Sequence, residues 1–221
     1  DELHFTEQPL PLPNLEGNFQ PVDALITPSG APVTWPKVDV VIGNPPFTGA
    51  KFLKPERGVD YVRMLRNAYP QVPGMADYCV FWIRKVHDHL STHTNEDPVA
   101  GRAGLVGTQN ICHNKSRIGG LDYVVSSGTI VDAVDNQPWS GEANVKVSIV
   151  NWVKTKDPNL LPKKRYLWFQ VPPEIAPGSE IPMVKYALDR RECSFISSGL
   201  TDSTDVSGAI SLTCNLAPQR V

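Results

Sequence analysis

The feature that most constrains the fold is a short apolar run that stops abruptly. Residues 38–42 are Val-Asp-Val-Val-Ile, and Gly43 then leads into Asn44-Pro45-Pro46-Phe47. A run rich in β-branched residues favours a strand, and a nearly continuous apolar run is typical of a strand buried inside a sheet. Glycine followed by two prolines interrupts such a strand. We therefore predict a buried strand over residues 38–42 that ends in a loop.

The rest of the chain alternates predicted strands and helices. Apolar residues recur every three or four positions over residues 61–68 and 76–90, which indicates helices, and a third helix is predicted over 117–125. Further strands are predicted over 19–26, 104–107, 128–134 and 145–153. This alternation indicates an α/β domain with a mostly parallel sheet. The last two strands have no helix between them, so we expect an antiparallel hairpin at one edge.

Composition excludes some classes of protein. Lys and Arg number 21 and Asp and Glu 23, for a net charge of −2, so the chain as a whole lacks the basic surface that holds DNA by charge alone. No apolar run reaches the ~18 residues of a membrane span, and no segment resembles a signal peptide. The four cysteines stand apart without metal-site spacing. We therefore expect a cytoplasmic protein without disulfides.

The Asn44-Pro45-Pro46-Phe47 segment is the strongest candidate site, because ligands of open α/β sheets bind beyond the carboxyl ends of the strands. The side-chain oxygen of Asn44 and the carbonyl of Pro45 can accept both N–H groups of an exocyclic amine, which localises the nitrogen lone pair. Pro45 and Pro46 fix the backbone. Phe47 offers a face for a planar base, worth ~1–3 kcal/mol. The alternative is a plain turn between a strand and a helix.

This segment resembles motif IV of the S-adenosylmethionine-dependent amino methyltransferases, particularly the adenine-N6 DNA methyltransferases. An ordered series of motifs over residues 20–153 is similar to the MmeI-like (type IIL) restriction–modification enzymes. Besides residues 41–47, the series comprises Gly49-Ala50-Lys51, Asp60-Tyr61-Val62, Val72-Pro73-Gly74, Ala76-Asp77-Tyr78, Phe81-Trp82, Arg102-Ala103-Gly104-Leu105-Val106, Thr108-Gln109-Asn110, Ile130-Val131-Asp132-Ala133, Pro138-Trp139 and residues 143–150.

The resemblance implies a class I methyltransferase-like sheet and methyl transfer from S-adenosylmethionine to adenine N6 in duplex DNA, within a restriction–modification system and without a metal. It implies that Asp23 (motif III), Asn44 and Asp77 (motif V) contact the methyl donor. Lys51, Lys54 and Arg57 follow the catalytic loop, where contact with the DNA backbone is expected.

Three family features are not found: the glycine-rich donor loop, the ribose-binding acid and the nuclease domain. From the resemblance we expect a chain truncated at its N-terminal side, inactive alone and weak in binding the donor. The edge of strand 38–42 would then be open to self-association. The expected parts are 1–37 with motif III, 38–155 with motifs IV to VIII, and 156–221 as an irregular connector toward a target-recognition domain.

Other features favour plainer interpretations. His87, His89 and His93 have partial metal-site spacing, but a solvated helix end is favoured. The basic triplet at 163–165 is favoured as a solvated turn over a phosphate contact, and Trp139 and Trp152 as core or rim aromatics. Two other functions stay open: a non-catalytic DNA-binding or scaffold module with a degenerate methyltransferase fold, and an amino methyltransferase that acts on protein or RNA.

Overall fold

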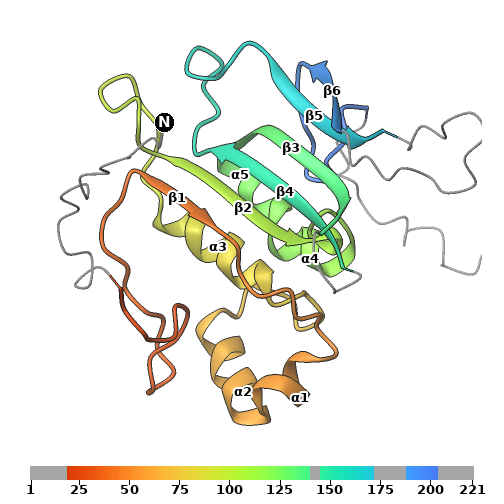
Figure 1. The fold of residues 1–221 in the computed structure, drawn as a ribbon. Coiled ribbons are helices and arrows are strands. Elements are labelled where there is room, and N and C mark those ends of the chain that lie inside the picture. Colours follow the sequence, from red (N-terminus) through yellow and green to blue (C-terminus); the bar gives the residue numbers. More distant parts are fainter. Residues whose placement is uncertain (1–18, 140–144, 172–187, 204–221) are drawn as a thin grey trace, which may run out of the picture.

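The computed structural model describes residues 19–139, 145–171 and 188–203. Six strands form one open sheet in the order β1-β2-β4-β3-β5-β6 (Figure 1). The strands are β1 (Val40–Gly43), β2 (Arg102–Thr108), β3 (Thr129–Pro138), β4 (Lys146–Val153), β5 (Arg165–Gln170) and β6 (Leu188–Cys193). Helices pack against this sheet, so the predicted α/β class is confirmed.

The sheet is mixed rather than mostly parallel. β1 and β2 are parallel, as are β3 and β5, whereas the pairs β2–β4, β3–β4 and β5–β6 are antiparallel. Strands β1, β2, β3 and β5 therefore run in one direction, and β4 and β6 run in the other. The carboxyl ends of β1, β2 and β3 consequently meet at the same edge of the sheet.

The position of β4 corrects the predicted edge hairpin. β3 and β4 do form an antiparallel pair, but β4 lies between β2 and β3 in the interior of the sheet. Its residues Val147, Ser148, Val150, Trp152 and Val153 are buried and point to both faces of the sheet. A strand that is apolar on both faces is more stable at the centre of a sheet than at its edge.

Residues 156–221 were expected to be irregular, and this is wrong for residues 165–170 and 188–193, whereas residues 156–164 and 194–203 contain no helix or strand. β5 and β6 come from this region and extend the sheet beyond β3. The prolines stand outside β5, at positions 162 and 172, so they bracket a strand that they do not interrupt. Trp168 on β5 donates from Nε1 to Asp132 Oδ2 on β3 at 3.0 Å, which ties this region to the sheet.

The strand predicted over residues 19–26 is also wrong. The Asp23 carboxylate oxygen Oδ1 accepts the backbone N–H groups of Leu25 at 2.8 Å and Ile26 at 2.9 Å, which makes a turn. Only an isolated bridge between Ile26 and Pro32 follows. Leu25 is nonetheless fully buried. Its side chain therefore anchors this segment to the core, without the backbone hydrogen bonds that would pair a strand with the sheet.

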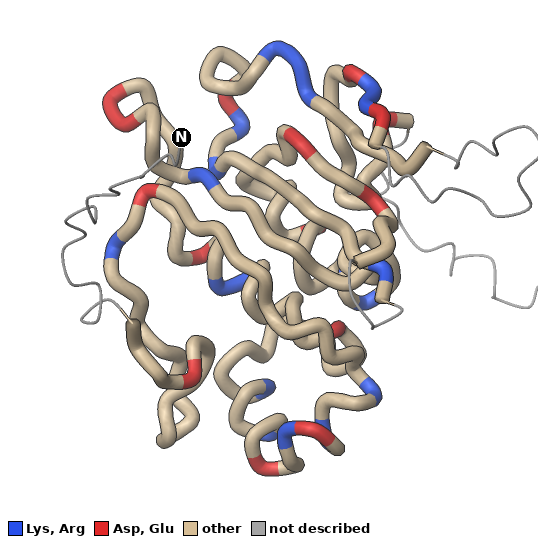
Figure 2. The backbone as a smooth tube through the Cα atoms, viewed as in Figure 1, with Lys and Arg blue, Asp and Glu red and all other residues tan. Residues whose placement is uncertain are grey.

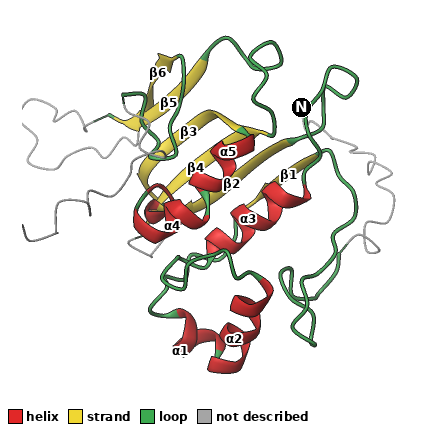
Figure 3. Cartoon of the chain, turned by 180° about the vertical axis from the view of Figure 1, so that it is seen from behind, coloured by secondary structure: helices red, strands yellow, loops and turns green. Residues whose placement is uncertain are grey.

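Helices α3, α4 and α5 cover one face of the sheet, as the two opposite views show (Figures 1 and 3). The helices are α1 (Leu53–Arg57), α2 (Val59–Ala68), α3 (Cys79–His89), α4 (Asn114–Gly119), α5 (Leu121–Ser127) and the 3₁₀ helix η2 (Gln109–Cys112). The apolar stripe of α3 is buried in the core as its spacing predicted. Within the described ranges, no helix combines the length and hydropathy needed to cross a membrane.

The helix predicted over 117–125 is two helices that meet at Gly119 and Gly120. A Cβ atom at Gly119 would lie 2.6 Å from the Pro73 side chain, so this junction packs closely against the loop before α3. Cys79 and Cys112 are buried, as predicted, and burial raises the pKa of their thiols to about 11 and about 12.

The three histidines of the α3 region are not a solvated helix end. His87 and His93 are buried, and their rings bond to Ser127 Oγ and to the Ala100 carbonyl, each at 2.9 Å. His89 bonds instead to the Pro36 carbonyl. The three rings thus have different partners. Nowhere in the described chain do three or more His, Cys, Asp or Glu residues gather as a potential metal site.

The buried His87 predicts a loss of stability in acid. Burial lowers its pKa to about 4. In the unfolded chain a histidine takes up a proton near pH 6.5, so the unfolded state binds more protons than the folded state between these values. The free energy of unfolding should fall by at most roughly 3 kcal/mol as the pH drops from 7 to 4.

Urea unfolding at pH 7.5, 5.5 and 4.5 measures this loss. His87→Gln should flatten the pH dependence, whereas the matched variant His89→Gln should retain it. An unchanged dependence in His87→Gln would show that other groups cause the loss.

Candidate active site

The Asn44–Phe47 loop follows the last residue of β1 directly, as predicted. Asn44 is exposed and Pro45 is buried. Among the described residues, no group donates a hydrogen bond to the Asn44 side chain or to the Pro45 carbonyl. A cleft of about 280 Å³ runs beside this loop, with Trp35, Trp82 and the end of β1 among its walls. Asn44 and Pro45 both line this partly apolar cleft, and their acceptors have no donor among the described residues.

The register of the sheet brings a second loop to this point. Gly43 of β1 pairs with Leu105 of β2, and the two strands are parallel. β2 continues to Thr108, where η2 begins. A Cβ atom at Gly107 would lie 2.6 Å from the Ile111 side chain, so glycine allows η2 to fold back closely on β2. The ends of β1 and β2 thus form one continuous edge.

Asp77 holds these two loops together. Its side chain is only 5% exposed, and its carboxylate accepts three hydrogen bonds. Oδ1 accepts from the Ala50 backbone N–H at 3.1 Å, and Oδ2 accepts from Thr108 Oγ1 at 2.7 Å and Asn110 Nδ2 at 3.0 Å. Asp77 was predicted to contact a methyl donor. That contact stays a prediction, and the contacts seen here make Asp77 a clamp between the loop after β1 and the end of β2.

Phe47 forms an aromatic corner with Trp139. Their rings meet edge to face, with centroids 5.7 Å apart. Trp139 follows β3, whose pairing with β4 shifts register between Val134 and Gln137 at Asn136, a residue with φ of +54°. Such a bulge increases the local twist and turns the following side chains. The partly buried Trp139 is thereby placed at the edge that carries Asn44.

Asp23 borders a separate apolar cavity of about 620 Å³, whose lining includes Ile26, Val33, Tyr61 and Met64. Its Oδ2 atom accepts from the Tyr61 hydroxyl at 2.8 Å, and the Tyr61 and Tyr78 hydroxyls bond to each other. Burial raises the pKa of both tyrosines, so both stay protonated. The backbone N–H of Tyr78 donates to the Thr48 carbonyl, which completes a hydrogen-bonded chain from Asp23 to the loop after β1.

The three basic residues of the predicted DNA contact are exposed and lie on or just before α1. Lys51 and Arg57 lie over the rings of Phe52 and Tyr78, at 4.8 and 5.3 Å from the centroids, and Lys54 is exposed on α1. Acidic positions alternate with basic ones along α1 and α2 (Figure 2). The basic side chains are therefore accessible beside the candidate loop, but they do not form a uniform positive surface.

The structure thus joins Asn44, Phe47 and Asp77 at one edge of the sheet and connects Asp23 to them through two tyrosines. The sequence interpretation missed the pairing of Trp139 with Phe47. The signal for it was the strand predicted before Trp139, since parallel strands place their carboxyl ends together.

No protein-family model matches the chain, and no curated protein matches it. Among solved structures, the type IIL restriction–modification enzyme MmeI in complex with DNA is similar, with a TM-score of 0.54 and 18% identity over 76% of this chain. A modification subunit of a putative type I restriction enzyme from Vibrio vulnificus YJ016 matches 72% of the chain and 34% of its own, with a TM-score of 0.46 and 15% identity.

The matched region spans only 20% of the MmeI chain. At this identity the likeness concerns the fold. About three quarters of this chain thus shares its fold with about a fifth of MmeI.

Proposed function

We propose that this chain forms the target-base site of a DNA methyltransferase that acts on adenine N6 within a restriction–modification system. The observation that carries the proposal is the loop after β1, where Asn44 and the Pro45 carbonyl stand free beside the Phe47–Trp139 corner. The similar fold of part of MmeI supports it.

The proposed chemistry is mostly positioning. A flipped adenine presents a planar ring and an amino group, and its extraction from the stack costs a few kcal/mol. Phe47 would stack on the ring, with its own ring packed edge to face against Trp139. The Asn44 side-chain oxygen and the Pro45 carbonyl would each accept one amino N–H, which directs the nitrogen lone pair outward. Alignment of the reacting atoms then supplies most of the rate enhancement.

The residues present fit the adenosine end of S-adenosylmethionine. An apolar cavity of about 620 Å³ has room for a purine, and the exposed Asp23 carboxylate stands on its rim as a hydrogen-bond acceptor. Bound there, S-adenosylmethionine would supply an electrophilic methyl group. Asp77 is almost fully buried and already accepts three hydrogen bonds from the protein, so we assign it an indirect part, which is to hold the Asn44 loop in place.

The test is methyl transfer by the protein expressed from the complete open reading frame that contains this chain. Labelled S-adenosylmethionine is incubated with duplex DNA, RNA or protein substrates, and the methylated product is identified after digestion. N6-methyladenine in DNA would support the proposal. Label in RNA or protein, or DNA binding without any transfer, would replace it with one of the other two functions considered from the sequence.

A further expectation concerns β1. In the described chain β1 pairs only with β2, and its Val40 and Ile42 side chains are 44% and 83% exposed. An apolar strand with one unpaired edge invites pairing with another chain. We propose that the 221-residue chain self-associates through this edge. Sedimentation should show dimers or larger species, and Ile42→Lys should shift them toward monomer, whereas Ile118→Lys on α4 should not. A monomeric wild-type chain would contradict this.

A further inference from the structure

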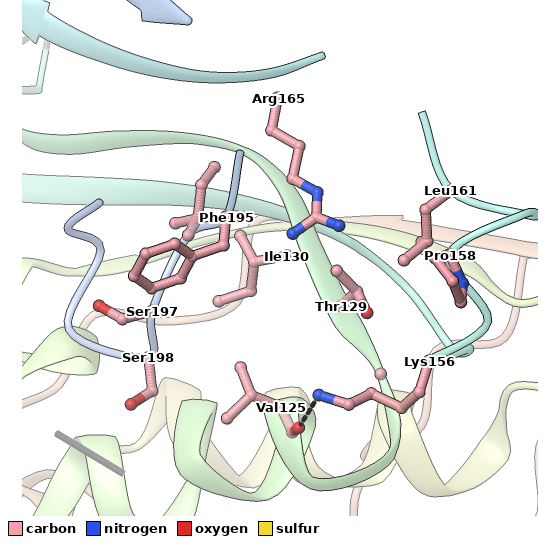
Figure 4. Close-up of a pocket in the computed structure, with 12 residues that line it drawn as sticks. Val125, Thr129, Ile130, Lys156, Pro158, Leu161, Arg165, Phe195, Ser197 and Ser198 are labelled. Atoms are coloured by element: carbon pink, nitrogen blue, oxygen red, sulfur yellow. Dashed lines mark hydrogen bonds between the residues drawn. The ribbon is translucent and has the colours of Figure 1, made fainter. Parts of the chain in front are cut away.

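A small cavity lies at the amino ends of the parallel strands, whereas Asn44 lies at their carboxyl ends. The cavity lies at the amino ends of β3 and β5, where Thr129 and Arg165 begin their strands, and has a volume of about 240 Å³ (Figure 4). Pockets for drug-sized ligands measure ~300–1,000 Å³. This cavity therefore suits a small ion or group.

Two cations reach this cavity. Arg165 approaches it from β5, and Lys156 approaches it from the loop after β4, on the other side of the same space (Figure 4). The Lys156 ammonium donates to the Val125 carbonyl at 2.9 Å, which leaves two of its three donors. Two residues of the basic triplet at 163–165 have different surroundings. Lys164 forms an ion pair with Glu192 at 2.9 Å, whereas Arg165 faces the cavity.

The positive charge of this cavity is not balanced by the described protein. Its described lining includes no carboxylate, and neither Arg165 nor Lys156 forms an ion pair within the described residues. Burial lowers the pKa of the Arg165 guanidinium. The buried Nε atom of Arg165 and the buried hydroxyl of Ser198, which also lines the cavity, have no described hydrogen-bond partner. Such groups usually have a partner in folded proteins.

We propose that this cavity binds a phosphate group, held by Arg165 and Lys156. Guanidinium and ammonium groups form short, charge-assisted hydrogen bonds with phosphate oxygens. The apolar side chains of Val125, Ile130 and Phe195 also line the site, and they strengthen this attraction by excluding water. The site is separate from the proposed base site, because the two lie at opposite ends of the parallel strands. Free phosphate and the phosphodiester of a nucleic acid have this chemistry in common.

Calorimetric titration of the 221-residue chain with inorganic phosphate tests the proposal. The buffer is free of phosphate, and sodium chloride keeps the ionic strength constant. Saturable binding to one site is expected. Arg165→Gln and Lys156→Gln should each weaken the binding about tenfold or more, since each removes a charge-assisted hydrogen bond. Lys163→Gln is the matched control, because this exposed neighbour does not line the cavity.

Lys156 is exposed, so Lys156→Gln keeps the test valid if Arg165→Gln does not fold. A second titration adds a short DNA duplex. Displacement of phosphate by the duplex, with loss of duplex binding in Lys156→Gln, would identify nucleic acid as the source of the phosphate. Phosphate binding that the duplex leaves unchanged would identify a free phosphate. Absence of saturable binding, or equal binding by wild type and Lys156→Gln, would overturn the proposal.

Discussion

Asn44→Ala should slow methyl transfer by about 10²-fold or more and leave DNA binding unchanged. In the proposed site the Asn44 side chain acts on the amino group of the target base, and it makes no contact that binding to the DNA backbone requires. Loss of one precisely placed polar group in an active site costs about 10²–10³ in rate. The measurement is single-turnover transfer of a labelled methyl group to duplex DNA by the full-length protein, with DNA affinity measured in parallel.

The matched control for this variant is Asn67→Ala, which removes an exposed amide from α2, away from the loop. Phe47→Ala should have a milder effect, because the lost stacking is worth only ~1–3 kcal/mol. A rate for Asn44→Ala within tenfold of wild type, or ~1.4 kcal/mol of barrier, would contradict the assignment of this residue.

Asp77→Ala should destabilise the fold and disorder the loop after β1. The substitution removes a buried carboxylate and leaves the donors of Ala50, Thr108 and Asn110 without their acceptor. A buried group left unpaired costs ~1–3 kcal/mol, so the total loss in the free energy of unfolding should be roughly 2–4 kcal/mol. Urea unfolding of the 221-residue chain measures it.

Asp77→Asn keeps the shape of the side chain and one acceptor oxygen, so it should lie between wild type and Asp77→Ala. Asp60→Ala is the surface control, since Asp60 is exposed and its one ion pair among the described residues is with the exposed Arg63. If Asp77→Ala changed stability by less than ~0.5 kcal/mol, the range of ordinary surface substitutions, Asp77 would not be a clamp.

The sequence predicted the elements better than their arrangement. The β-branched run before Asn44 and the apolar stripe of α3 are local signals, and both elements form close to where they were expected. The prediction that the strand is buried is wrong, because β1 lies at the edge of the described sheet and its Val40 and Ile42 side chains are exposed. The place of β4 between β2 and β3 depends on which partner buries its two apolar faces, and this is a tertiary property. β5 was missed because prolines around a short strand look the same, in sequence, as prolines within an irregular segment.

The candidate site shows the same division. Asn44 and Phe47 were found because they follow a strand and carry recognisable chemistry. The contacts of Asp77 with Ala50 and Thr108 join residues 27 and 31 positions away, and no local pattern contains them. The contact between Phe47 and Trp139 depends in addition on the bulge at Asn136. The backbone there has a positive φ at a residue that is not glycine, so no glycine in the sequence marks the bulge.

The central position of β4 also sets the order in which the molecule can assemble. β2 gains its second partner only when residues 146–153 are available, about forty residues after β2 itself has been made. During synthesis, β2 therefore has only β1 as a partner among the described strands until β4 has been made. The nearby strands β3 and β4 can pair first and dock onto β2 as a unit. Because pairing between distant segments is slow, this docking should limit the folding rate.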